Sequence, residues 1–62
     1  MKQVPTMVAG VEVRPLRKPM EYRGERWLTL VPEADDDFRI WEFGLTSGRL
    51  IQTSDGSEYE AE

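Results

Sequence analysis

The chain has neither Cys nor His among its 62 residues, so it must hold its fold without disulfide bonds and without the commonest zinc ligands. A chain this short forms one domain at most and buries only about 60% of the surface that its unfolded form exposes. Its stability must therefore come from large side chains packed at high density. Aromatic residues crowd the middle of the chain, at Tyr22, Trp27, Phe38, Trp41 and Phe43.

Four prolines divide the chain into segments that are too short for long helices, because an interior proline removes a hydrogen-bond donor and clashes with the preceding turn. Between the prolines the pattern is typical of strands. Residues 7–14 are rich in valine and alternate apolar and polar side chains over 11–14, and residues 26–31 are largely apolar on both faces. A short strand is expected at Tyr22, turning at Gly24. The segment 26–31 is therefore predicted to be the central strand of a sheet.

A hairpin is expected in the second half of the chain. Aromatic and β-branched residues favour a strand over residues 38–45, although a helix over the same residues stays open. Residues 46–48 then form a predicted three-residue turn, with Gly48 in the left-handed region. This register places Phe43 opposite Ile51 and gives the two residues one face of the hairpin.

These elements predict a mostly β protein: one small domain over residues 1–53, with an antiparallel sheet of four to five strands and little or no helix. A single sheet cannot bury both of its faces within one chain. Either the sheet curls into a small barrel of the SH3-like kind, or a second copy covers the open face in a homodimer. Residues 54–62 carry four carboxylates and no apolar periodicity. They are expected to form a flexible acidic tail unless Tyr59 docks on the sheet.

No apolar stretch approaches the roughly 20 residues that are needed to cross a bilayer. Residues 1–13 also lack the apolar run that is typical of a signal peptide. A cytoplasmic location without a membrane partner is therefore expected.

Catalysis and metal binding have little support in the residue types present. Nucleophilic catalysis would need a Ser or Thr activated by a carboxylate or a lysine, and neither Lys2 nor Lys18 belongs to a Ser-x-x-Lys motif. The three consecutive Asp residues at 35–37 lack the alternate spacing and the glycine of a calcium loop. The sequence thus predicts a non-catalytic protein with no cofactor and no metal site.

The net charge of −4 is unevenly placed, because residues 1–26 hold six cations against three carboxylates and residues 27–62 hold two against nine. This asymmetry predicts a small acidic interaction protein that binds another protein, as an inhibitor or an adaptor. Small acidic inhibitors of phages and mobile elements are similar in size and charge only. The expected acidic binding site consists of Glu33, Asp35, Asp36 and Asp37. An exposed apolar patch is expected at Trp27, Trp41 and Phe43.

Two alternatives stay open. The segment 14–26 could contact phosphate groups and make the chain a nucleic-acid-binding β-barrel, although its net negative charge repels a polyanion at long range. The residues that would carry this function are Arg14, Arg17, Lys18 and Arg23. A barrel mouth or a dimer interface could instead hold a small ligand.

Overall fold

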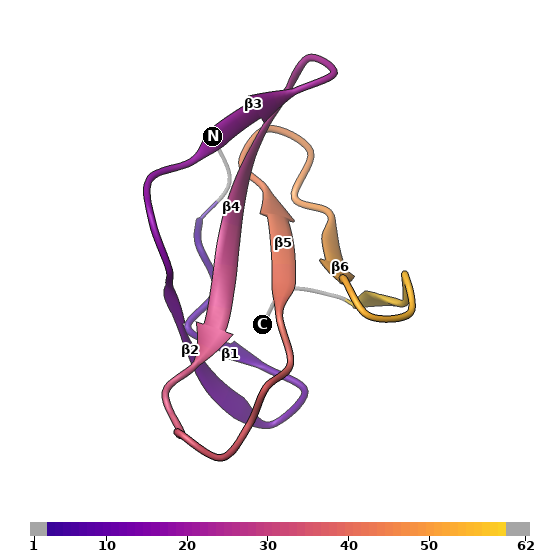
Figure 1. Ribbon diagram of the computed structural model, residues 1–62. Helices are drawn as coiled ribbons and strands as arrows, with labels where there is room; N and C mark the ends of the chain where they lie inside the picture. Colours follow the sequence, from indigo (N-terminus) through magenta and orange to yellow (C-terminus); the bar gives the residue numbers. More distant parts are fainter. Residues whose placement is uncertain (1–2, 60–62) are drawn as a thin grey trace.

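The computed structural model describes residues 3–59, and over that range the chain is built of seven strands without a helix (Figure 1). The strands are β1 (Met7–Val8), β2 (Val11–Pro15), β3 (Met20–Tyr22), β4 (Glu25–Pro32), β5 (Trp41–Gly44), β6 (Leu50–Gln52) and β7 (Glu58–Tyr59). The predicted fold class is confirmed, and residues 41–44 are a strand rather than part of a helix. The strand count is seven rather than four or five. No helix in the described range is long and apolar enough to span a bilayer.

All pairings between neighbouring strands are antiparallel, and they follow the order β1-β2-β4-β5-β6-β7. The short strand β3 lies off this path, and it pairs with β4. All three residues of β3 are exposed. The sheet curls into a nearly closed, barrel-like shape (Figure 1).

β4 is the central strand, as predicted, because it pairs with β2, β3 and β5. Leu28 and Leu30 are buried on the inner face of the curled sheet. On the outer face Thr29 is also buried, whereas Trp27 and Val31 are only half-buried. The curling therefore covers the inner face completely and leaves the outer face partly open.

The core lies on the inner face and unites residues from most of the strands. Val4 and Tyr59 pack against it from the two ends of the described range. Its buried members are Val8, Val13, Leu28, Leu30, Trp41, Phe43, Leu45 and Leu50.

Two tight turns use residues with positive φ at both central positions, which is the geometry of a two-residue hairpin loop. Arg23 and Gly24 have φ of 52° and 79°, so the predicted turn at Gly24 is confirmed. Ala9 and Gly10 have φ of 51° and 77°. This second turn splits the expected strand over residues 7–14 into the β1–β2 hairpin.

The hairpin of β5 and β6 is confirmed, but its register differs from the prediction by one residue. Phe43 pairs with Leu50 rather than with Ile51. The loop has four residues, 45–48, and Gly48 has the expected left-handed φ of 80°. Because side chains alternate along a strand, the shift puts Leu50 in the core and Ile51 on the outer face.

Tyr59 docks on the sheet. It pairs with Leu50 across β6 and β7, packs against the core, and donates its hydroxyl proton to Gln52 Oε1 at 2.8 Å. Residues 54–57 consequently form the connection between two strands, where the sequence suggested the start of a tail. The last part of that expected tail, residues 60–62, lies outside the described residues.

Candidate functional site

The outer face of the sheet carries an apolar hollow of about 400 Å³, and the atoms that line it are almost all carbon. The hollow is shallow and largely open to solvent. Its lining residues come from four strands and are Met20, Glu21, Tyr22, Trp27, Glu42 and Ile51.

Strand pairing brings these side chains together. Residues that face each other on antiparallel strands project to the same side of the sheet. Met20 faces Trp27 across β3 and β4. Glu42 faces Thr29 on β4 and Ile51 on β6. The hollow is therefore fixed by the register of three neighbouring strand pairs.

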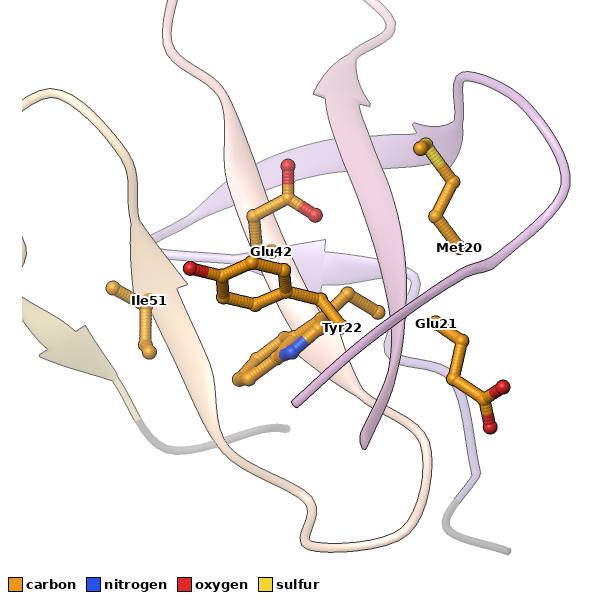
Figure 2. Close-up of a pocket in the computed structure, with 6 residues that line it drawn as sticks. Met20, Glu21, Tyr22, Glu42 and Ile51 are labelled. Carbon is orange, nitrogen blue, oxygen red and sulfur yellow. The ribbon is translucent and has the colours of Figure 1, made fainter. Parts of the chain in front are cut away.

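The rim of the hollow exposes large apolar side chains. Met20 is 58% exposed and Tyr22 is 62% exposed. Figure 2 shows the Tyr22 ring extending toward Glu42 and Ile51, whereas the carboxylate of Glu21 points away from them. Exposed apolar side chains that gather around one hollow make it a candidate binding site.

Glu42 supplies the charge inside this apolar surface. Its half-buried carboxylate accepts a hydrogen bond from the Thr29 hydroxyl, with Oε1 at 3.0 Å and Oε2 at 2.9 Å from Oγ1. A hydroxyl has one proton to donate, while a carboxylate offers about four acceptor positions. The three ion pairs found over residues 3–59 do not include Glu42. The carboxylate thus has acceptor positions left for a further donor.

Beside the hollow, Glu25 clamps the loop 45–48 to β4. Its carboxylate accepts hydrogen bonds from the backbone N–H groups of Thr46 and Ser47, both at 3.0 Å, and from its neighbour Arg26 at 2.9 Å. Partial burial raises the pKa of Glu25. The hydrogen bonds from the Ser47 side chain and from the three N–H groups outweigh that effect, and the pKa falls from 4.5 to about 2.

Gly44 makes room for this clamp. It pairs with Trp27 at the edge of the hollow. A Cβ atom at Gly44 would lie 2.6 Å from Ser47 Oγ and 2.9 Å from Glu25 Oε2, closer than real contacts allow. A side chain at this position would therefore require the ends of the Ser47 and Glu25 side chains to move.

The acidic residues predicted as a binding site share the loop 33–40, between β4 and β5. Asp35 and Asp36 are exposed in it. Glu33 forms an ion pair with Arg14, whose Nε lies 3.0 Å from Glu33 Oε1.

Asp37 is engaged within the same loop. Its Oδ1 accepts hydrogen bonds from the backbone N–H and the Nε of Arg39, each at 3.0 Å. The side-chain hydrogen bond from Arg39, with the backbone hydrogen bond next, lowers the pKa of Asp37 from 3.8 to about 2. Two of the four predicted acidic residues are thus already neutralised by arginines of the same chain.

The basic residues of the alternative site are distributed along β4. Arg14 binds Glu33 just past the C-terminal end of β4, and Arg23 precedes its N-terminal end, with its guanidinium 5.3 Å from the centroid of the Tyr22 ring. The length of β4 separates them by roughly 25 Å. Arg17 and Lys18 are exposed in the connection between β2 and β3. These four residues do not form one compact patch.

The apolar patch expected at three aromatic residues does not exist as a surface. Trp41 and Phe43 are fully buried on the inner face, while Trp27 lies on the outer face. Residues on different strands share a face only in a particular register, which the sequence alone left open. The alternating apolar residues Met20 and Tyr22, next to the turn at Gly24, are a local sequence signal for one wall of the hollow only.

Over residues 3–59 no group of three or more carboxylates is arranged to hold a metal ion. Comparison of the chain with protein-family models, with curated proteins and with solved structures finds no match in any of the three.

Proposed function

We propose that this chain is a non-catalytic binding domain that recognises another protein through the hollow on its outer face. The observation that carries the proposal is the gathering of Met20, Tyr22, Trp27 and Ile51 around one open apolar hollow. Contact of large apolar side chains with water is unfavourable, so a partner that buries them gains binding free energy. A hollow of this volume fits one side chain or a short segment of a partner.

The hollow replaces the acidic loop as the main element of the proposed surface. Asp35 and Asp36 keep their charges exposed and can steer a cationic partner toward the domain. The affinity is expected to come from the hollow, because aromatic anchors in pockets dominate binding energy. The inhibitor or adaptor role, the cytoplasmic location and the homodimer that the sequence suggested remain predictions.

The test is a capture experiment from a lysate of the organism that encodes the chain. The bait carries Met20→Thr and Tyr22→Thr, which remove the apolar rim and keep residues that favour strands. A matched bait carries Leu16→Thr and Phe38→Thr, which remove two exposed apolar side chains outside the hollow. Circular dichroism checks that all baits are folded.

The proposal expects proteins that the unchanged chain and the Leu16/Phe38 variant retain, and that the Met20/Tyr22 variant loses. Equal capture by all three baits would contradict it. Capture that disappears after nuclease treatment would favour the nucleic-acid alternative. A shift of Trp fluorescence with protein-free metabolite extract would favour a small ligand.

A further inference from the structure

Resting on the proposed function, we infer that the hollow receives a lysine side chain of the partner protein. The aliphatic stem of the lysine lies against Tyr22 and Trp27, and its ammonium group reaches the carboxylate of Glu42. A lysine side chain matches the hollow because an apolar lining and the Glu42 carboxylate lie next to each other in it.

The carboxylate of Glu42 makes a purely apolar side chain a poor occupant of the hollow. Its carboxylate is half-buried and is held by the Thr29 hydroxyl alone among the described side chains. An apolar side chain in the hollow would displace water from the Glu42 carboxylate without donating a hydrogen bond to it. Desolvation of a charge without a new hydrogen bond costs free energy. An ammonium group at the same place donates to the acceptor positions that Thr29 leaves open.

The rest of the lining suits the stem of a lysine. Lysine buries its chain of methylene groups along apolar surface and keeps its charged head at a polar rim. Met20 and Ile51 offer apolar surface to that chain, and the face of Trp27 attracts a cation electrostatically. The Tyr22 ring adds apolar surface, because the Arg23 guanidinium already lies 5.3 Å from its centroid. The hollow thus offers complementary surface to both parts of one side chain.

The charges around the hollow favour a cation. Three carboxylates line the hollow or the pocket beside it, against two guanidinium groups, which leaves a local charge of −1. The chain as a whole carries −4. The carboxylates are those of Glu21, Glu25 and Glu42, and the guanidinium groups are those of Arg23 and Arg49. A basic segment is therefore drawn to this face both from a distance and at contact.

The experiment is a selection from random heptapeptides displayed on phage, run in parallel against the unchanged chain, the Met20→Thr/Tyr22→Thr variant and Glu42→Gln. Glutamine keeps an oxygen that accepts the Thr29 hydrogen bond, so it removes the charge with little change in shape. We expect the unchanged chain to select peptides with lysine at one fixed position. The Met20/Tyr22 variant should lose these peptides, and Glu42→Gln should select an apolar residue at that position.

A selected peptide is then synthesised with norleucine in place of the lysine, which deletes only the ammonium group. Binding to the unchanged chain should weaken about tenfold, the effect of one partly desolvated cation contact. Binding to Glu42→Gln should be nearly the same for both peptides.

The outcomes separate the two proposals. Peptides that depend on Met20 and Tyr22 but carry no lysine, or carry arginine in its place, would overturn the lysine inference and support the hollow as a docking site. A selection in which no peptide depends on Met20 and Tyr22 would overturn the proposed function and, with it, the inference.

Discussion

Thr29 donates its hydroxyl proton to the Glu42 carboxylate across β4 and β5, with its Oγ1 3.0 and 2.9 Å from the two carboxylate oxygens. Thr29 is buried and Glu42 is half-buried, so the bond fixes a charge on an apolar face. We expect a double-mutant cycle of Thr29→Val and Glu42→Ala, each of which removes one partner of the hydrogen bond, to give a coupling free energy of about 1 kcal/mol. The measurement is urea unfolding of the four proteins. Additive effects of the two changes would show that the bond is not formed in solution.

The protein should lose stability as the pH falls from about 4.5 to about 2. Glu25 and Asp37 have pKa values lowered to about 2 in the folded chain. The unfolded chain binds protons at higher pH than the folded chain does, so protonation in this window favours unfolding, and the stabilisation is fully present above it. Urea midpoints measured between pH 2 and pH 6 should show this slope.

The matching control for the acid effect is the Glu25→Gln/Asp37→Asn variant, which removes both titrating groups. Its urea midpoint should change less over the same pH window than that of the unchanged chain. A parallel pH dependence in the two proteins would assign the acid sensitivity to other carboxylates.

Gly44→Ala should destabilise the fold by about 1 kcal/mol, because the ends of the Ser47 and Glu25 side chains must move and a hydrogen bond of Glu25 is disturbed. The new Cβ would meet Ser47 Oγ at 2.6 Å and Glu25 Oε2 at 2.9 Å. Adding Ser47→Ala should recover part of the loss, because it removes the nearer of the two atoms. Thermal unfolding of the single and double variants measures both effects, and the absence of any rescue would argue against this contact as the cause.

A chain that ends at Thr53 should be less stable than the full chain by about 2 to 4 kcal/mol. The truncation removes β7, uncovers the side of Leu50 that Tyr59 contacts, and deletes the Tyr59 to Gln52 hydrogen bond. Tyr59→Phe, which removes only the hydroxyl group, should cost about 1 kcal/mol. Urea unfolding compares the three proteins. Equal stability of the truncated and full chains would show that residues 54–59 do not stabilise the sheet.

The sequence predicted the strand character of the chain because alternation and prolines are local signals. The hairpin at Gly48 was found for the same reason. Its register was missed because Leu45 was assigned to the strand, whereas it is a buried loop residue whose N–H donates to the Arg26 carbonyl at 2.9 Å. That hydrogen bond joins the loop 45–48 to β4, which is distant in the sequence. A pattern of neighbouring residues cannot predict such a contact.

The candidate site could not be found from the sequence for a related reason. The hollow needs Met20 opposite Trp27, Thr29 opposite Glu42, and Glu42 opposite Ile51, so it depends on three pairings at once. A shift of one residue in any of these pairings moves part of the lining to the other face. The local charge pattern instead indicated the acidic loop, where Asp37 is bound by Arg39.

Of the strands that form the hollow, β3 has the smallest share in the core, because all of its residues are exposed and it lies off the main path of the sheet. One wall of the hollow is therefore expected to open at a lower free energy than β4 does. Backbone amides of β3 should exchange with deuterium faster than those of β4, and an occupant of the hollow should slow them. β3 can then adjust to the shape of the bound side chain while the other strands stay paired.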